Sequence, residues 1–285
     1  MVDADAPPGW RRHTLRAAGL ELAVFETGAP DGPPVLLLHG LGLWTSVTWD
    51  RLVARLDPRR RYVALDLPGF GASEKPDARY DTAFFRHVLE AAVPALGAGQ
   101  VALVGHSLGG LLAADFAGAH PDRVRRLVLL APAGFAHPRR HLALAVAARL
   151  ARPLFMRPPR RALIAATLRG SVHDPASLDA GIVEQAQALG ADPALRRAFA
   201  RVYAAGLPAF ASPAHRRTAQ ARYARYGGPV LCAWGRRDRY LPIAALAIVR
   251  RVYPQARTLI LEHSGHLPTR EEPAALATAI DAFLS

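Results

Sequence analysis

Cysteine, lysine and long apolar runs are scarce in this sequence, and each shortage narrows what the chain can be. Cys232 is the single cysteine, so no intrachain disulfide can form, and its place inside an apolar run favours a small core residue over a nucleophile. No apolar run approaches about 18 residues, which argues against a membrane-spanning helix. Internal repeats and low-complexity tracts are also missing. A chain of 285 residues is long enough for one large buried core and an added subdomain.

The first eight residues, MVDADAPP, are acidic and contain two prolines. They lack the basic start and the apolar stretch of a secretory signal peptide. We therefore expect a soluble, cytoplasmic protein.

Positive charge is abundant and consists almost entirely of arginine. The chain carries 36 Lys and Arg against 23 Asp and Glu, and Lys75 is the only lysine. Residues 139–225 hold 15 arginines against four acidic residues. One interpretation is a surface that attracts anionic lipid headgroups or steers an anionic substrate. The simpler interpretation is a solvated helical surface on which arginine replaces lysine. Nucleic acid is not an expected partner, because interleaved aromatic residues and a recognised binding module are missing.

The segment Gly105-His106-Ser107-Leu108-Gly109 is the most informative motif. An apolar run, residues 101–104, precedes it, and a helical pattern, residues 108–120, follows it, so it predicts a strand, a sharp turn and a helix. A serine hydroxyl is a poor nucleophile and must be presented on such a turn, beside a base and oxyanion donors. We expect glycine at both flanking positions because a Cβ there would collide with the turn.

Two downstream loops supply an acid and a base in the order that this motif requires. Asp238 follows the apolar run 229–235 and is the expected acid. His266 follows the apolar run 258–261 and a glycine, and is the expected base. His263 competes with it, but lies closer to the strand end and lacks the preceding glycine. His106 is expected to have a packing role, since it adjoins the serine in sequence.

An upstream loop completes the predicted site. His39-Gly40-Leu41-Gly42 follows the apolar run 35–38, where a backbone donor for an oxyanion belongs. We assign the oxyanion donors to the N–H groups of Leu41 and Leu108. His39 is expected to bond within its own loop.

The order of apolar runs predicts the fold class. Such runs recur at residues 21–27, 35–38, 62–65, 101–104, 127–131, 230–234 and 258–261, with helical patterns between most of them. Short apolar strands that alternate with helices are typical of a mostly parallel sheet covered on both faces. Ligands in such sheets bind beyond the carboxyl ends of the strands, where every residue proposed above lies.

The alternation breaks once, between residues 134 and 227. Helical stretches at 142–150, 160–168, 180–189 and 193–203 occur there, without a convincing strand. We interpret this insertion as a helical cap over the site, which selects the substrate. The expected organisation is a core of residues 1–133, a cap of residues 134–226 and the rest of the core in residues 227–285.

Several motifs together resemble the α/β-hydrolase superfamily, in its cap-bearing branch of esterases, lipases and carbon–carbon bond hydrolases. They are His39 to Gly42, Asp66-Leu67-Pro68-Gly69-Phe70-Gly71-Ala72-Ser73, Gly105 to Gly110, Trp234-Gly235-x-x-Asp238, and Gly265-His266 with Glu272-Pro273 behind it. The resemblance implies an eight-stranded sheet with a cap after strand 6. It also implies Ser107 as nucleophile, Asp238 as acid and His266 as base, with Leu41 and Leu108 at the oxyanion.

The expected function is hydrolysis of carboxylic esters with small or medium, fairly apolar groups. A carbon–carbon bond hydrolase acting on vinylogous diketones is the main alternative, although Leu267 stands where that group tends to carry an aromatic residue. A perhydrolase or acyltransferase would use the same residues. A non-catalytic binding protein is a remote alternative, because the serine, the acid and the base are all present.

No metal or other cofactor is expected. His137 and His141 have the four-residue spacing of helical metal ligands, but no carboxylate or cysteine accompanies them nearby. Gly69-x-Gly71 lacks the rest of a phosphate-binding fingerprint. The sequence leaves the acyl and alcohol groups and the oligomeric state open.

Overall fold

The computed structural model describes residues 6–42, 44–97, 99–135, 156–205 and 213–285. Within these residues, the centre is an eight-stranded sheet with the order β1-β2-β4-β3-β5-β6-β7-β8. β1 pairs antiparallel with β2, β2 pairs antiparallel with β4, and all other neighbours are parallel. The strands are β1 (Arg11–Ala17), β2 (Leu20–Gly28), β3 (Pro34–Leu38), β4 (Arg61–Leu65), β5 (Val101–His106), β6 (Val124–Leu130), β7 (Val230–Gly235) and β8 (Arg257–Leu261). The expected α/β class is confirmed.

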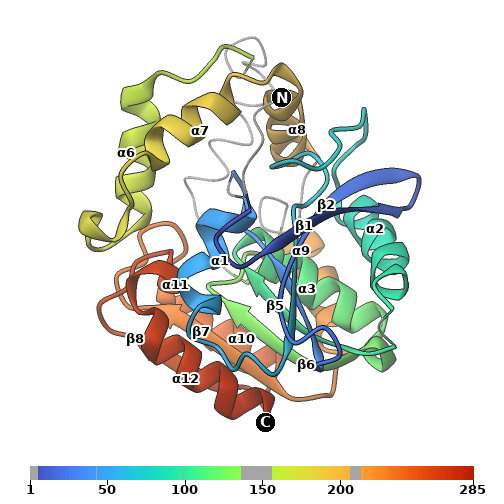
Figure 1. Ribbon diagram of the computed structural model, residues 1–285. Coiled ribbons are helices and arrows are strands. Elements are labelled where there is room, and N and C mark those ends of the chain that lie inside the picture. Colours follow the sequence, from blue (N-terminus) through green and yellow to red (C-terminus); the bar gives the residue numbers. More distant parts are fainter. Residues whose placement is uncertain (1–5, 43, 98, 136–155, 206–212) are drawn as a thin grey trace.

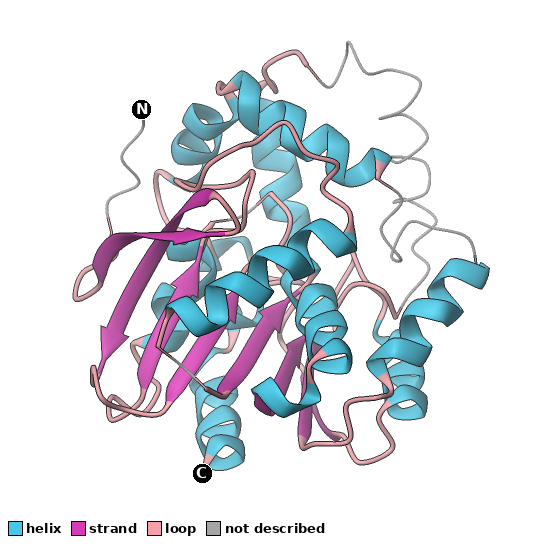
Figure 2. Cartoon of the chain, turned by 90° about the vertical axis from the view of Figure 1, so that its right-hand side faces the viewer, coloured by secondary structure: helices cyan, strands magenta, loops and turns pink. Residues whose placement is uncertain are grey.

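Helices cover both faces of the sheet (Figures 1 and 2). Those of the described residues are α1 (Thr45–Val53), α2 (Thr82–Ala95), α3 (Leu108–Ala119), α6 (Arg161–Ser171), α7 (Ile182–Gly190), α8 (Pro193–Ala204), α9 (Pro213–Tyr223), α10 (Leu246–Val252), α11 (Pro268–Glu271) and α12 (Pro273–Leu284). Short 3₁₀ turns lie at Pro121–Arg123, Pro175–Ser177 and Ile243–Ala245.

Alternate residues of one strand explain why both faces need a cover. In β3, Val35 and Leu37 join the apolar cluster that α1 and α12 complete. Leu36 and Leu38 join the cluster on the opposite face, with residues of α2, α3 and α10. A strand that is apolar at every position is stable only between two such layers. The sheet is therefore fixed in place, and so are the loops at its carboxyl edge.

β1 was missing from the expected strands, and its composition gives the reason. Six of its seven residues are exposed or half-buried, and three of them are arginines. An antiparallel edge strand buries little side-chain area, so it leaves no apolar run in the sequence. Its position is fixed by backbone pairing with β2.

The segment between β6 and β7 contains helices and no strand within its described residues. α6, α7 and α8 fall close to three of the stretches expected to be helical, and they lie together at one end of the molecule (Figure 1). α9 instead packs on the core, where a Cβ at Gly118 of α3 would lie 2.2 Å from the carbonyl oxygen of Arg222. The stretch 142–150 lies outside the described residues.

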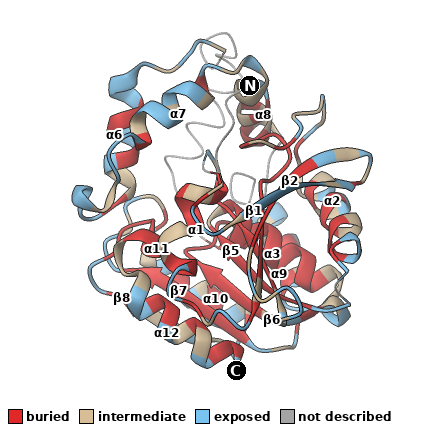
Figure 3. Cartoon of the chain, in the orientation of Figure 1, coloured by how far each residue is buried: buried red, intermediate tan, exposed pale blue. Residues whose placement is uncertain are grey.

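Burial differs between the two parts of the molecule (Figure 3). The sheet and its flanking helices are mostly buried, whereas α6 and α7 have largely exposed outer faces. In the described part of the chain, no helix has both the length and the apolar character needed to cross a membrane.

Candidate active site

Ser107 occupies a strained turn between β5 and α3. Its φ of 52° and ψ of −111° lie in a region that residues with a side chain rarely adopt. A Cβ at Gly105 would lie 2.3 Å from the carbonyl oxygen of Gly109, and one at Gly109 would lie 2.0 Å from that of Leu38. Both distances are far below contact, so the turn requires glycine at each side of the serine, as the motif predicts. The strained turn places the hydroxyl at the carboxyl edge of the sheet.

Three side chains from distant parts of the sequence form one hydrogen-bonded chain. Ser107 Oγ lies 2.9 Å from His266 Nε2, and His266 Nδ1 lies 2.7 Å from Asp238 Oδ2. Because an ionised carboxylate only accepts hydrogen bonds, Nδ1 carries the ring proton and Nε2 is free to accept the serine proton. The structure thus brings together the expected nucleophile, base and acid, in the arrangement of a serine hydrolase triad.

Asp238 is held by the backbone that follows it. Its Oδ1 accepts hydrogen bonds from the N–H groups of Tyr240 at 2.8 Å and Leu241 at 2.9 Å. Its side chain is fully buried, while that of His266 is 11% exposed. The carboxylate is therefore fixed in orientation, and only Oδ2 is directed at the histidine.

His39 links two loops beside the site and has no contact of the kind a catalytic base needs. Its Nδ1 donates to the carbonyl oxygen of Gly40 at 2.8 Å, and its Nε2 accepts from the N–H of Leu67 at 2.9 Å. Both ring nitrogens are engaged, which fixes the neutral tautomer. Burial lowers the pKa of His39, and the nearby Asp66 only partly opposes this. His39 bonds within its own loop, as expected, and also to Leu67 in the loop that follows β4.

The two expected oxyanion donors, Leu41 and Leu108, face the same cavity as Ser107 and His266. Leu108 is the first residue of α3, where helix geometry leaves the N–H without an intrahelical acceptor. The loop that carries Leu41 approaches the turn closely, since a Cβ at Gly40 would lie 3.2 Å from the Ser107 Cβ. This close approach explains the glycine. The proposed donors thus flank the serine from two separate elements.

His106 contacts both the backbone and the ring of His266. Its Nε2 donates to the backbone oxygen of His266 at 2.7 Å, and the two rings lie 4.9 Å apart. Burial, followed by repulsion from His266, lowers the pKa of His106 to about 3. The ring therefore stays neutral beside the base, in the packing role expected for it.

A cavity of about 830 Å³ opens above Ser107 and His266. Ligand pockets of roughly 300 to 1,000 Å³ are typical for small molecules. The core and the helices between β6 and β7, the segment expected to form the cap, both contribute apolar walls, which include Leu41, Trp44, Phe70, Leu108, Leu267, Ile164, Leu168, Leu189, Leu195, Phe199 and Tyr203. Arg157, Arg160 and Arg196 also border it. The cavity thus accepts an apolar group next to the serine and carries positive charge on its cap side.

Three residues that were not predicted from the sequence also shape the site. Asp66 accepts from the N–H of Thr45 and from that of Ala72, both at 2.9 Å, and so joins the loops after β3 and β4. Tyr240 stacks on the His266 ring with centroids 5.6 Å apart. Glu271 bonds the backbone of Gly265 at 2.7 Å. The only sequence signals were the position of Asp66 in a quoted motif and the proximity of the other two to Asp238 and His266.

The remaining candidates lie away from this chain of hydrogen bonds. His263 is exposed, and its backbone N–H donates to Glu272 at 2.9 Å. Of the two candidate histidines, His266 is therefore the one that is hydrogen-bonded to Ser107. His137 and His141 lie outside the described residues. Among the residues that are described, no group of three His, Cys, Asp or Glu side chains is placed to hold a metal ion.

Comparison with known proteins shows which family this chain resembles in sequence and fold. A family model described as alpha/beta hydrolase fold matches residues 33–273. An uncharacterised protein of Mycobacterium tuberculosis is 30% identical over 90% of this chain and 76% of its own length. A 2-hydroxymuconate semialdehyde hydrolase of Pseudomonas putida is 28% identical over 95% of this chain and 93% of its own. The crystal structure of a membrane phospholipase A, described as a bacterial virulence factor, is 29% identical with a TM-score of 0.79, over 97% of this chain and 86% of that one. The chain belongs to the alpha/beta hydrolase fold family.

Proposed function

We propose that the protein is a serine hydrolase that cleaves carboxylic esters with small or medium, fairly apolar groups. One observation supports this above all: the hydrogen-bonded chain from Ser107 through His266 to Asp238 ends at the floor of an apolar cavity. A nucleophile, a base and a buried carboxylate in this order are the parts that acyl transfer needs.

The proposed reaction has two steps. His266 Nε2 takes the Ser107 proton as Oγ attacks the ester carbonyl, and Asp238 stabilises the imidazolium that forms. The N–H groups of Leu41 and Leu108 receive the developing oxyanion. The same proton then passes to the leaving alcohol, which departs. His266 next takes a proton from water, the hydroxide attacks the acyl-enzyme, and Ser107 regains its proton as the acid leaves.

Hydrolysis of p-nitrophenyl esters, from acetate to palmitate, tests the proposal on the wild type and on Ser107→Ala. We expect turnover in the wild type with an optimum at an intermediate chain length. In Ser107→Ala, kcat should fall by roughly 10⁴-fold or more, because only binding and the oxyanion donors remain to accelerate the reaction. Equal turnover in both proteins would contradict the assignment of the nucleophile.

Carbon–carbon bond hydrolysis is the second candidate. The similarity to the 2-hydroxymuconate semialdehyde hydrolase favours it. Leu267 is buried against the cavity at the position after the base, where that group tends to carry an aromatic side chain, and this favours the ester hydrolase. A vinylogous diketone dienoate assayed beside the ester series separates the two, by comparing kcat/KM.

An alcohol or peroxide added as second acceptor would reveal acyltransferase or perhydrolase activity. If the protein turned over none of these substrates, the result would favour a non-catalytic binding protein.

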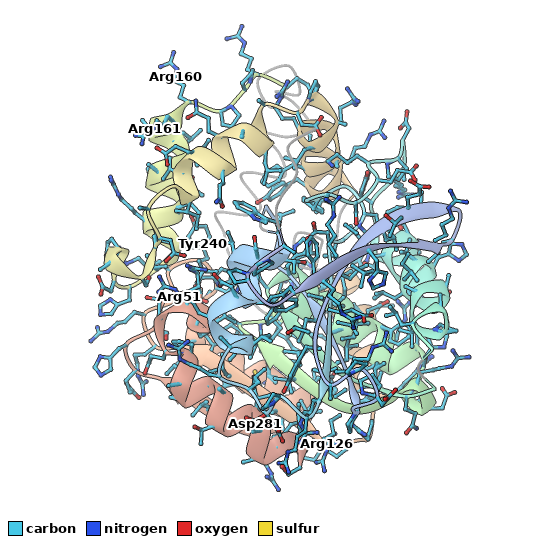
Figure 4. All side chains as sticks on the ribbon, viewed as in Figure 1. Arg51, Arg126, Arg160, Arg161, Tyr240 and Asp281 are labelled. Atoms are coloured by element: carbon cyan, nitrogen blue, oxygen red, sulfur yellow. The ribbon has the colours of Figure 1, made fainter. Side chains whose placement is uncertain are left out.

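We further propose that the cap surface associates with anionic lipid headgroups. Arg157, Arg160, Arg169 and Arg197 are exposed on or beside α6 and α8, and Arg160 and Arg161 point away from the core at the outer end of α6 (Figure 4). Leu163 borders the same cavity as Arg157 and Arg160 and is 61% exposed. A large exposed apolar side chain close to arginines favours the boundary between headgroups and acyl chains.

A further inference from the structure

The end of the cap helix α6 is bonded directly to the loop of the proposed base. The backbone N–H of His266 donates to the carbonyl oxygen of Ser171, the last residue of α6, at 2.7 Å. The contact is tight, because a Cβ at Gly265 would lie 2.8 Å from the backbone nitrogen of His173. No side chain fits between the segment after α6 and the loop of His266. A shift of α6 would therefore move the backbone that carries the imidazole.

Glu271 joins the same two segments through one carboxylate. Its Oε1 accepts from the N–H of His173 at 2.5 Å and from that of Asp174 at 3.2 Å. Its Oε2 accepts from the N–H of Gly265 at 2.7 Å. One oxygen thus holds the cap segment after α6, and the other holds the residue before His266. The proposed reaction uses neither oxygen.

Tyr240 makes a second connection between α6 and the core (Figure 4). Its hydroxyl donates to the carbonyl oxygen of Thr167 in α6 at 2.9 Å. Its ring stacks on that of His266 at an interplanar angle of 27°, and its N–H bonds Asp238. The base is therefore bordered by two residues that also hold the cap.

We propose that Glu271 is a positioning residue that couples the cap to the base, so that a substrate seated against α6 aligns His266 with Ser107. This rests on the proposed ester hydrolysis. Leu168 and Ser171 of α6 line the cavity, so an acyl chain that fills it presses on the helix whose end holds His266. Binding energy from the remote part of a substrate is then used in the chemical step, and longer acyl chains raise kcat as well as lowering KM.

The test compares Glu271→Gln with Glu272→Gln on p-nitrophenyl acetate, butyrate and hexanoate. The glutamine keeps the volume of Glu271, but its NH₂ group must face the N–H donors of either the cap or the histidine loop. Glu272 is the matched control, since it accepts from His263 N–H at 2.9 Å and Ser264 Oγ at 2.7 Å, and both of these partners belong to the histidine loop and not to the cap. For Glu271→Gln we expect kcat to fall by about 10- to 100-fold, with KM within about threefold.

The dependence on chain length separates coupling from a general loss of stability. In Glu271→Gln, kcat should no longer rise from acetate to hexanoate, while in the wild type and in Glu272→Gln it should. Retention of the rise in Glu271→Gln, or its equal loss in Glu272→Gln, would overturn the coupling. If Glu271→Gln does not fold, Tyr240→Phe decides. It keeps the ring and backbone contacts but loses the bond to Thr167, and it should weaken the same rise.

Failure of the underlying function has a different signature. A fluorophosphonate probe reacts with an activated serine whether or not an ester is turned over. A wild type that resists the probe and hydrolyses no ester would end the proposed function. A labelled, active wild type with an unchanged kcat pattern in the variants would end only the coupling.

Discussion

Three histidines lie in or beside the site, and their hydrogen-bond partners give them different roles. His39 accepts from one backbone N–H and donates to a backbone oxygen, so it has no free nitrogen for chemistry. His106 donates to the backbone of His266. Only His266 has a carboxylate on one nitrogen and a serine hydroxyl on the other. The hydrogen-bond partners of each ring, more than its proximity to Ser107 in the sequence, therefore make His266 the proposed base.

His106 makes the stability of the fold sensitive to acid. Its folded pKa of about 3 lies below the ordinary value of 6.5, so between these values the unfolded chain binds a proton that the folded chain does not. Stability therefore falls as the pH drops from 6.5 towards 3, by up to about 1.4 kcal/mol per pH unit. His106→Gln keeps a donor for His266 and removes this contribution. We expect its urea unfolding free energy to fall less steeply below pH 6.5 than that of the wild type.

His87→Gln serves as the control for this measurement, because the His87 side chain is 71% exposed. Its slope should match that of the wild type. Identical slopes for wild type and His106→Gln would show that the burial of His106 does not govern acid stability.

Ser107, Asp238 and His266 could be found from the sequence because each follows an apolar run and the three occur in a fixed order. Tyr240 and Glu271 could not. Their roles depend on bonds to Thr167 and His173, and the position of a cap helix is set by packing that leaves no periodic signal in the sequence. Residue patterns thus predict the proposed catalytic side chains, but not the contacts that hold them to the helices between β6 and β7.

At the scale of elements, the cap helices act as walls of the cavity. α6 contributes Ile164 and Leu168, and α7 contributes Ala186 and Leu189. The opposite faces of both helices are mostly exposed. Ala186 lines the cavity with a small side chain, so a larger residue at this position should limit the length of the acyl chain.

Ala186→Phe should shift the preferred p-nitrophenyl ester towards shorter chains. The ring would fill part of the cavity, so kcat/KM for the longest ester accepted should fall by roughly tenfold or more, while acetate, which lies near Ser107, changes little. Ala188→Phe is the control, since Ala188 lies on the same helix with an exposed side chain. A parallel loss on acetate and long esters, or the same shift in Ala188→Phe, would contradict the assignment of this wall.

Whether an element could be predicted from the sequence depends on how much of it is buried. Strands that are covered on both faces, such as β3 and β7, show as apolar runs and were predicted within one or two residues. β1 was missed because its arginines face solvent and only Leu15 and Ala17 pack on the core, so it leaves no apolar run in the sequence. α9 lies in the segment expected to be helical but matches none of the four stretches named there, since its mostly polar sequence leaves only Ala219 and Tyr223 buried.

For the molecule as a whole, strand order converts distant sequence positions into one site. Ser107 follows β5, Asp238 follows β7 and His266 follows β8, and all three strands run parallel. The loop with Leu41 follows β3, which pairs with β5. Parallel strands bring their carboxyl ends to one edge of the sheet, and residues of α6, α7 and α8 line the cavity beside Ser107 there. The sequence order of the motifs was therefore sufficient to predict the edge, but not the shape of the cavity above it.

The uneven charge of the molecule leads to a prediction about membranes. Wild-type protein should co-sediment with vesicles that contain anionic lipid and be released by high salt, because about 1 kcal/mol per arginine comes from the surface potential. Arg157→Gln with Arg160→Gln should weaken binding by roughly tenfold or more. Arg123→Gln with Arg126→Gln is the charge-matched control at the opposite end, where Arg126 lies (Figure 4). Binding that ignores lipid charge and salt would contradict the proposed association.

The central claim is that His266 activates Ser107 as the nucleophile. Its most direct test is to treat the protein with a fluorophosphonate and to locate the adduct by mass spectrometry of the digested protein. We predict one adduct, on Ser107, none in Ser107→Ala, and labelling slower by roughly 10³-fold or more in His266→Ala. A wild type that is not labelled, or a label that persists in Ser107→Ala, would contradict the claim.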